Sequence, residues 1–254
     1  MAKKERIDKL LVDQGLAKSR TQAQALIMAG HVCLGDRLVL KASEKFETRL
    51  IFRLKEGAVS RFVSRGGEKL QGVLSDLRLS VKGLIALDIG ISTGGFTDCL
   101  LQNGVTHVTG LDVGHNQLDW KIKNDPRVKA FEGINARQIP SGLISEPVDI
   151  VVIDVSFISL TLIVGEALRF LKPKGLILAL IKPQFEVNKG RVGKGGVVKD
   201  PLLHKQVQDK IWALCEKLGL TELKIVESPL EGTDGNKEFF ISGLNHHSAG
   251  PAGL

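Results

Sequence analysis

Hydrophobic residues recur at helical spacing in two segments within the first 30 residues of the chain. The apolar positions that would form the inner faces of two helices are Ile7, Leu10, Leu11, Ala23, Leu26 and Ile27. Gly15 ends the first segment, Ser19 is a suitable N-cap for the second, and Gly30 ends the second. The pattern therefore predicts two short helices over residues 5–30.

Residues 31–40, HVCLGDRLVL, alternate instead with a period of two. Their apolar positions lie on either side of Gly35 and Asp36, a pair that favours a tight turn. We therefore expect a small hairpin after the two helices, and a compact module that ends near residue 55.

From residue 83 the hydrophobic positions form continuous runs. Four of these runs are GLIALDIG, HVTGLDVG, PVDIVVIDVSF and GLILALIKPQF, with helical segments expected between them. Strands that are apolar at every position are buried on both faces, so the runs indicate a mostly parallel sheet covered by helices on each side. Two further runs, at about 222–229 and 237–243, are separated only by a turn and predict an antiparallel pair that closes the sheet.

These patterns divide the chain into two domains. We expect a small α+β domain at residues 1–60, a linker and approach at 61–82, and an α/β domain at 83–244. The glycines of SRGGEKL, residues 64–70, support the linker, with Gly66 and Gly67 as a joint. Residues 245–254 show no core-forming pattern and are expected to be a disordered tail.

The positive charge of the chain is concentrated in its first quarter. Residues 1–70 carry 15 Lys and Arg against 8 Asp and Glu, whereas residues 71–254 carry 20 of each. A short basic unit joined to a neutral one suggests a tether to a polyanion, either nucleic acid or anionic lipid, although solubility alone would also account for it.

Other features of the sequence exclude several classes of protein. Cys33, Cys99 and Cys215 are widely spaced and form no CxxC pair, which argues against a disulfide framework or a zinc site and fits a reducing cytoplasm. No apolar run approaches the roughly 18 residues that a membrane helix needs. The N-terminus has no apolar core of a secretory signal. We therefore expect a cytoplasmic protein without a metal or membrane site.

The segment LDIGISTGGF combines an apolar strand with a glycine-rich turn. Such a turn lets the backbone approach a ligand closely, although its spacing is not that of the GxGxxG fingerprint. Asp112 ends the next strand, 22 residues after Gly90, where a carboxylate can accept hydrogen bonds from both ribose hydroxyls of an adenine nucleoside. The pattern fits NAD or S-adenosylmethionine, and the C-terminal antiparallel pair favours the latter. The residues expected at this cofactor are Asp88, Gly90, Ser92, Thr93, Gly94, Gly95, Phe96, Asp112, Val113 and Asp154.

Two motifs that are absent from the sequence limit which chemical group could accept a methyl group. The segment Asp154–Phe157 reads DVSF rather than the proline-containing motif common in amino-group methyltransferases, and no Pro-Cys pair supplies a cysteine nucleophile for pyrimidine carbon. A hydroxyl remains, and a ribose 2′-OH needs a positioned base or cation. Asp154, Lys182 and Glu238 lie at ends of predicted strands, where open α/β sheets bind ligands, and Lys69 lies at the approach to the first strand. We expect Lys69, as a second cation, to lower the pKa of a partly buried Lys182.

The N-terminal segment resembles the S4 RNA-binding module. The resemblance rests on RIDKLL, on Ser19-Arg20 at the start of the second helix, and on AGHV at its exit. It implies that RNA faces Arg6, Lys9, Lys18, Arg20 and Gln22.

The remainder resembles FtsJ-like 2′-O-methyltransferases, and the whole chain resembles the TlyA family, some members of which are called hemolysins. The matching strings are SRGGEKL, LDIGISTGGFTDCLLQ, LDVGHNQLDWK, VIDVSFISL and KPQFE. The resemblance implies a Rossmann-like, seven-stranded S-adenosylmethionine-dependent domain with the catalytic residues Lys69, Asp154, Lys182 and Glu238. It also implies 2′-O-methylation of ribosomal RNA, in family members on cytidine, with RNA or a ribosomal subunit as partner.

Within that resemblance, Lys182 would activate the 2′-OH. Asp154 and Lys69 would hold Lys182 and the ribose, and Glu238 would orient the lysines or the hydroxyl. A loop rich in glycine after Glu186 is expected to be a mobile basic lid over RNA, with contacts from Lys189, Arg191 and Lys194, and Arg65 is a further candidate contact. The alternatives are a non-catalytic S4-type ribosome-assembly factor and, with less support, a cytolytic hemolysin. The sequence predicts no oligomeric state.

Overall fold

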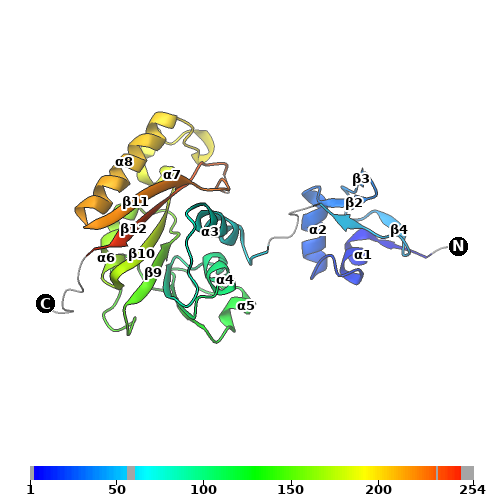
Figure 1. The fold of residues 1–254 in the computed structure, drawn as a ribbon. Helices are drawn as coiled ribbons and strands as arrows, with labels where there is room; N and C mark the ends of the chain where they lie inside the picture. Colours follow the sequence, from blue (N-terminus) through cyan, green and yellow to red (C-terminus); the bar gives the residue numbers. More distant parts are fainter. Residues whose placement is uncertain (1–2, 56–60, 233, 247–254) are drawn as a thin grey trace. The chain divides into compact units, whose positions relative to one another are not determined.

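The computed structural model describes residues 3–55, 61–232 and 234–246, and leaves the side chains of Lys189 and Lys194 undescribed. The chain forms two compact units, residues 1–60 and 61–254 (Figure 1).

The N-terminal unit contains the two predicted helices, α1 (Ile7–Asp13) and α2 (Arg20–Met28). Ser19 caps α2 as predicted, since its hydroxyl accepts a hydrogen bond from the Gln22 backbone N–H at 3.2 Å. The predicted hairpin is also confirmed, with β2 (Val32–Leu34) antiparallel to β3 (Arg37–Leu38). Three short strands were not predicted: β1 (Lys4–Arg6), β4 (Lys45–Glu47) and β5 (Arg53–Leu54).

A buried carboxylate joins the two helices of this unit. Asp8 is fully buried in α1 and accepts hydrogen bonds from Arg6 Nη2 at 2.9 Å, Arg20 Nη2 at 3.0 Å and Gln24 Nε2 at 2.8 Å. A buried carboxylate requires such partners, since otherwise its desolvation is costly. Two of the arginines expected to contact RNA are therefore also held in place by Asp8.

The C-terminal unit contains the predicted seven-stranded, mostly parallel sheet. Its strands are β6 (Ile85–Ile89), β7 (His107–Leu111), β8 (Val128–Phe131), β9 (Val148–Ile153), β10 (Leu171–Ile181), β11 (Leu220–Glu227) and β12 (Phe239–Asn245). Their order is β11-β12-β10-β9-β6-β7-β8, and β12 is antiparallel to both of its neighbours. The α/β fold class and the closing antiparallel pair are confirmed. Strand β8 was missed because its four residues form no continuous apolar run.

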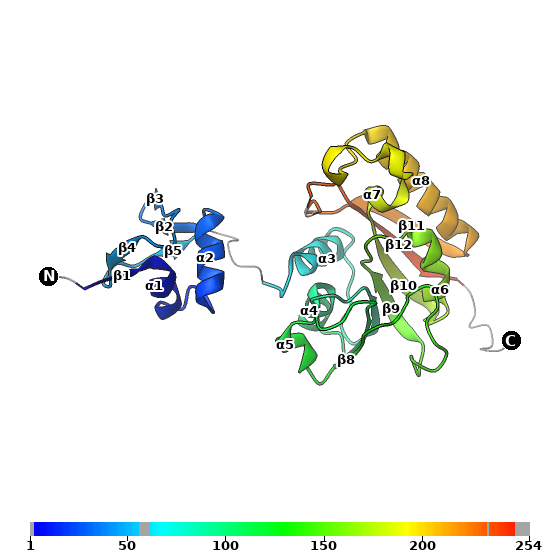
Figure 2. The ribbon, with the colours of Figure 1, turned by 180° about the vertical axis from the view of Figure 1, so that it is seen from behind.

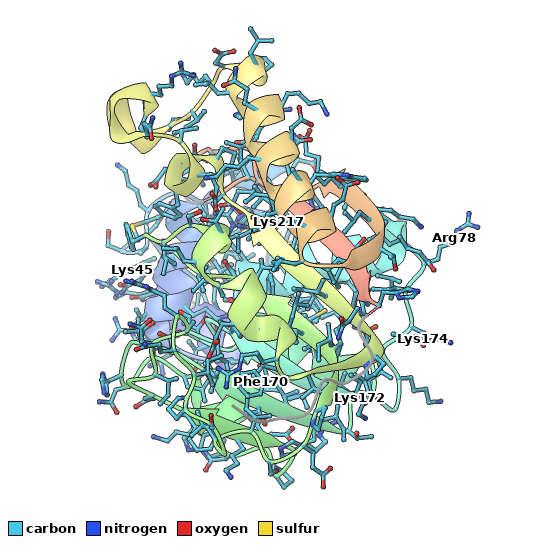
Figure 3. All side chains as sticks on the ribbon, turned by 90° about the vertical axis from the view of Figure 1, so that its left-hand side faces the viewer. Lys45, Arg78, Phe170, Lys172, Lys174 and Lys217 are labelled. Atoms are coloured by element: carbon cyan, nitrogen blue, oxygen red, sulfur yellow. The ribbon has the colours of Figure 1, made fainter. Side chains whose placement is uncertain are left out.

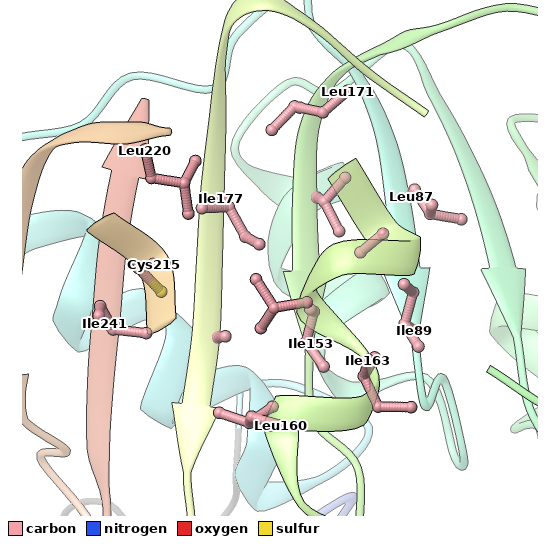
Figure 4. Packing of buried hydrophobic residues seen from close by; sticks show 14 of the residues in the cluster. Leu87, Ile89, Ile153, Leu160, Ile163, Leu171, Ile177, Cys215, Leu220 and Ile241 are labelled. Carbon is pink, nitrogen blue, oxygen red and sulfur yellow. The ribbon is translucent and has the colours of Figure 1, made fainter. Parts of the chain in front are cut away.

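Helices cover both faces of this sheet, because successive residues of each buried strand point to opposite sides. Leu87 of β6 and Ile153 of β9 belong to the same core cluster as residues of α6 (Val164–Leu168) and α8 (Pro201–Lys217), and Figure 4 shows this cluster with Cys215 of α8. Ala86 and Val152 pack on the other face, which is covered by α3 (Arg65–Asp76) and α4 (Gly95–Gln102) (Figures 1 and 2). The sheet is thus the middle of three layers.

Helix α3 corrects the prediction of a linker at residues 61–82. Leu70, Val73 and Leu74 lie on its inner face and belong to the core over α4. Their helical spacing outweighs the two glycines that suggested a joint. A Cβ on Gly67 would lie 2.3 Å from Phe62 Cγ, so this glycine permits close packing within a helix.

The chain end differs slightly from the expected tail. Strand β12 extends to Asn245, which is buried and donates a hydrogen bond from Nδ2 to the Leu171 carbonyl at 2.9 Å. The rest of the expected tail, from residue 247, lies outside the described residues. Among the helices that the structure describes, none has the length and hydrophobicity to cross a membrane.

Replacing Asp8 with alanine should destabilise the N-terminal unit by about 1–3 kcal/mol, because Arg6, Arg20 and Gln24 lose a buried acceptor. The hydrogen bond from Arg6 is the largest influence that holds the pKa of Asp8 well below its ordinary value. The contribution is therefore fully present above that ordinary value, about 4, and is lost as the pH falls towards the lowered one. Hydrogen exchange of α1 and α2 amides measures the effect. The exposed Asp13, also on α1, is the control, and equal changes in Asp8→Ala and Asp13→Ala would contradict the prediction.

Candidate active site

The predicted catalytic residues gather at one edge of the C-terminal sheet. Asp154 and Lys182 directly follow the parallel strands β9 and β10, and Gly90 directly follows β6. Glu238 precedes β12, and because β12 is antiparallel, its start lies at the edge where the parallel strands end. This carboxyl edge is where open α/β sheets bind ligands.

Two close ion pairs organise this edge. Lys69 of α3 contacts Glu238 with 2.5 Å between Nζ and Oε2, and both side chains are buried. Lys182 contacts Asp154 with 2.5 Å between Nζ and Oδ1, and its Nζ donates to Ser156 Oγ at 3.0 Å. Each lysine therefore has its own carboxylate. The structure places Asp154 against the Lys182 ammonium, and Lys69 lines the same cavity as Lys182.

Two cavities meet at these residues. The first, of about 660 Å³, is lined by all four predicted catalytic residues. The second, of about 520 Å³, is lined by Asp112 and extends to Asn135 and Arg137. The walls common to both cavities are Gly90, Ser92, Asp154, Ser156 and Phe157. A group bound in one cavity would therefore lie next to a group bound in the other.

The boundary between the cavities depends on Gly90. Its φ is +88°, a left-handed conformation that favours glycine. A Cβ at this position would lie only 2.2 Å from the Asp154 carbonyl oxygen, so no other residue fits without displacing the backbone. The glycine turn thus allows the loop after β6 to pack directly against the residue that follows β9.

Asp112 is fixed in orientation within the second cavity. Its Oδ2 accepts a hydrogen bond from the Ser92 backbone N–H at 2.8 Å, and its Oδ1 accepts one from Gly114 N–H at 2.7 Å. Each carboxylate oxygen can accept more than one hydrogen bond, so both remain available to a pair of vicinal hydroxyls. The loops after β6 and β7 position this carboxylate together.

The other residues expected at a cofactor are distributed differently. Val113 lines the second cavity, whereas Thr93, Gly95 and Phe96 line the first. Gly94 and Asp88 are not among the described residues that line either cavity.

Asp88 points into the core on the α4 side of the sheet and accepts a hydrogen bond from Thr97 Oγ1 at 2.6 Å. Burial raises the pKa of this carboxyl to about 7. Asp88 therefore supports the first turn of α4 through its hydrogen bond with Thr97.

Phe157 and Phe185 are residues of the first cavity that sequence reasoning did not single out. Phe157 has a φ of +64° and is 91% exposed, and its ring lies 5.0 Å from that of Phe185. An exposed aromatic ring held in an uncommon backbone conformation indicates a functional surface. Their positions in the sequence could have identified them, because Phe157 and Phe185 each lie three residues after a predicted catalytic residue.

The candidate RNA contacts in the C-terminal unit lie around the first cavity. Arg65 lines it and donates a hydrogen bond from Nη2 to the Glu231 carbonyl at 2.8 Å. Arg191 is exposed in the loop after α7 (Pro183–Glu186), whereas the side chains of Lys189 and Lys194 lie outside the description. Buried Asn236 anchors this loop, since its Nδ2 donates to the Gly196 carbonyl at 3.0 Å and its Oδ1 accepts from Val198 N–H at 2.9 Å.

The candidate contacts in the N-terminal unit also make internal interactions. Besides the bonds from Arg6 and Arg20 to Asp8, Lys9 pairs with Glu5 at 3.0 Å, and Gln22 accepts a hydrogen bond from the Lys18 backbone N–H at 2.7 Å. All five side chains remain at least partly exposed.

Other basic residues lie away from the cavities. Lys172 and Lys174 lie near the amino end of β10, as Figure 3 shows, while Lys182 follows its carboxyl end. Lys172 also pairs with Asp149 at 2.7 Å. These lysines therefore belong to the sheet edge opposite the candidate site.

Comparison with known proteins agrees with this geometry. Residues 62–244 match the FtsJ-like methyltransferase family model, and residues 5–48 match the S4 domain model. The 16S/23S rRNA (cytidine-2′-O)-methyltransferase TlyA of Mycobacterium tuberculosis is 41% identical over 95% of this chain and 90% of its own length. Hemolysin A of Brachyspira hyodysenteriae is 37% identical over 92% of this chain and 97% of its own length.

Solved structures show the same fold. A hemolysin candidate from Streptococcus thermophilus is 39% identical, covers 98% of this chain and 90% of its own, and has a TM-score of 0.75. The N-methyltransferase NodS of Bradyrhizobium japonicum, in complex with S-adenosyl-L-homocysteine, shares the fold at 15% identity and a TM-score of 0.52 over 72% of this chain and 89% of its own. With its paired cavities and its S4 unit, the chain belongs to the TlyA family of FtsJ-like methyltransferases.

Proposed function

We propose that this protein transfers a methyl group from S-adenosylmethionine to the ribose 2′-OH of cytidine in ribosomal RNA. One observation carries the proposal: a cavity lined by two lysine–carboxylate pairs shares Gly90 and Asp154 with a second cavity that contains Asp112. Two ligands in these cavities would be adjacent, as a group transfer requires. The names of the relatives supply the expectation of ribosomal RNA and of cytidine.

The second cavity fits S-adenosylmethionine. Asp112, held by two backbone N–H groups, would accept hydrogen bonds from the two ribose hydroxyls, and its negative charge would disfavour a 2′-phosphate. Because Gly90 has no side chain, the backbone of Asp154 approaches it closely in the wall that the two cavities share. When bound, the cofactor supplies an electrophilic methyl group.

In the first cavity, Lys182 and Asp154 would act on the 2′-OH together. Lys182 forms an ion pair with Asp154 and donates a hydrogen bond to Ser156, and an ammonium has three donor hydrogens in all. In its amine form Lys182 would accept the hydroxyl proton, and Asp154 would stabilise the ammonium that results. Lys69 and Glu238, which line the same cavity, would position the ribose.

The N-terminal unit would supply RNA affinity. Arg6, Lys9 and Arg20 keep exposed donor groups despite their internal partners, and contacts to phosphate provide much of the affinity for nucleic acid. A non-catalytic assembly factor would have no use for the four residues that converge on the first cavity. The protein is therefore better described as an enzyme with its own RNA-binding domain.

Replacing Asp112 with alanine should weaken S-adenosylmethionine binding roughly 10- to 100-fold, the equivalent of about 1–3 kcal/mol for lost hydrogen bonds. Titration calorimetry in the presence of an RNA fragment measures this, because cofactor affinity can depend on bound RNA. The exposed carboxylate of Asp76 offers a matched control. Equal affinity in Asp112→Ala and Asp76→Ala would remove Asp112 from the cofactor site.

Replacing Lys182 with alanine should lower kcat by about 10²- to 10⁴-fold, the usual contribution of a positioned acid or base. A radiolabelled methyl assay on ribosomal RNA measures turnover, and circular dichroism checks the fold. Lys205→Ala, at an exposed pair with Asp209, is the control. Turnover of folded Lys182→Ala at the wild-type rate would refute the mechanism.

Lys69 and Arg65 should separate chemistry from RNA binding within one cavity. Lys69→Ala should reduce kcat by about 10-fold or more while RNA affinity changes little, because the lysine is buried against Glu238. Arg65→Ala should mainly weaken RNA binding, by roughly threefold to tenfold, as one exposed phosphate contact would. Rate measurements and filter binding on the same RNA compare the two, and equal losses of turnover and affinity in Lys69→Ala would contradict its role.

A further inference from the structure

Two chain segments continue beyond the strand ends that carry Asp154 and Lys182. One runs from residue 155 to 160 after β9, and the other runs through α7, residues 183–186, after β10. The ion pair of Lys182 with Asp154 joins the segments at their base, and the ring contact of Phe157 with Phe185 joins them further out. Glu186 makes a third connection between the segments.

Glu186 is a buried carboxylate that neither the proposed chemistry nor the cavity walls use. Its side chain is 1% exposed. Oε1 accepts a hydrogen bond from the Leu160 backbone N–H at 2.6 Å, and Oε2 accepts from Ser159 Oγ at 2.6 Å. Oε2 also accepts from Lys210 Nζ of α8 at 2.9 Å. Three donors therefore compensate the burial of this carboxylate, and two of them belong to the segment after β9.

The same contacts fix the local shape of the segment after β9. Ser159 donates its hydroxyl hydrogen to Glu186, so its oxygen accepts from the Thr161 backbone N–H at 3.2 Å and begins the short 3₁₀ turn Leu160–Leu162. Ile158 and Ile163, on either side of this turn, line the second cavity. Glu186, four residues after Lys182, thus fixes a segment that forms part of the wall of the second cavity, which Asp112 also lines.

We propose that Glu186 is a positioning residue that sets the alignment of the Asp154–Phe157 segment with Lys182. The first segment borders both cavities, and the second directly follows Lys182. The contacts of Glu186 with Ser159 and Leu160 would therefore set the position of the methyl donor in the second cavity relative to the hydroxyl group in the first. In-line transfer is sensitive to displacements of about 1 Å, which can reduce the rate about 100-fold. The inference rests on the proposed function and adds to it a residue outside the two cavities.

Glu186→Gln tests the inference, because it keeps the size of the side chain but turns an NH₂ group towards donors. We expect kcat to fall roughly 10- to 100-fold while the Kd values for RNA and for S-adenosylmethionine change less than about threefold. Ser159→Ala removes one of the two contacts and should give a smaller fall. Hydrogen exchange of the Leu160 amide, read without any substrate, should become about tenfold faster or more in Glu186→Gln as its acceptor weakens.

Two control variants separate positioning from general stability. Lys210→Ala removes the ion pair and a hydrogen bond to the Glu186 carbonyl but leaves the contacts from Ser159 and Leu160, so turnover should fall clearly less than in Glu186→Gln. Lys205→Ala, on the same helix, should change neither turnover nor exchange.

The inference would be overturned by wild-type turnover in folded Glu186→Gln. It would also be overturned by unchanged exchange at Leu160 or by an equal loss of turnover in Lys210→Ala. Absence of methyl transfer by the wild-type protein on any ribosomal RNA would instead refute the proposed function, and the exchange measurement would still test the contact.

Discussion

The close approach of Gly90 to Asp154 is the constraint on which the rest of the site depends. With no side chain at Gly90, the backbone after β6 can pack against the carbonyl of Asp154. That contact makes one thin wall serve two cavities, so the residue that pairs with Lys182 also borders the cavity that holds Asp112. The three-layer core supports this wall, because β6 and β9 are paired neighbours at the centre of the sheet and are buried on both faces.

Pairing each lysine with a separate carboxylate has an energetic reason. A charged group removed from water is costly to bury unless a partner and hydrogen bonds compensate it. Lys69 with Glu238, and Lys182 with Asp154, place four charges of zero net sum in one cavity. The cavity can therefore present ammonium groups to a polar substrate without concentrating uncompensated charge inside the domain. The same logic applies to Asp8 in the N-terminal unit, where basic residues and an amide surround a single buried carboxylate.

The sequence was most informative where the physical signal is continuous along the chain. Unbroken apolar runs indicated the central strands, and the polar residues that end them indicated the site, since parallel strands bring their carboxyl ends to one edge. Signals failed where partners come from distant segments. Gly66 and Gly67 suggested a joint because Phe62 and α4, against which α3 packs, are apparent only in the fold. Asp88 was expected at the cofactor, but the pleat of β6 directs its side chain into the core. Glu186 has no local feature in the sequence that distinguishes it from a surface carboxylate.

The antiparallel strand β12 has a consequence for the order in which the enzyme becomes competent. It lies between β10 and β11, and Glu238 at its start pairs with Lys69, 169 residues earlier in the chain. During synthesis, α3 and the parallel strands leave the ribosome long before this strand does. Until residues 238–245 emerge, β10 has an open edge and Lys69 has no carboxylate. The Lys69–Glu238 pair and the sheet around the first cavity are therefore completed only when one of the last segments of the chain has been made.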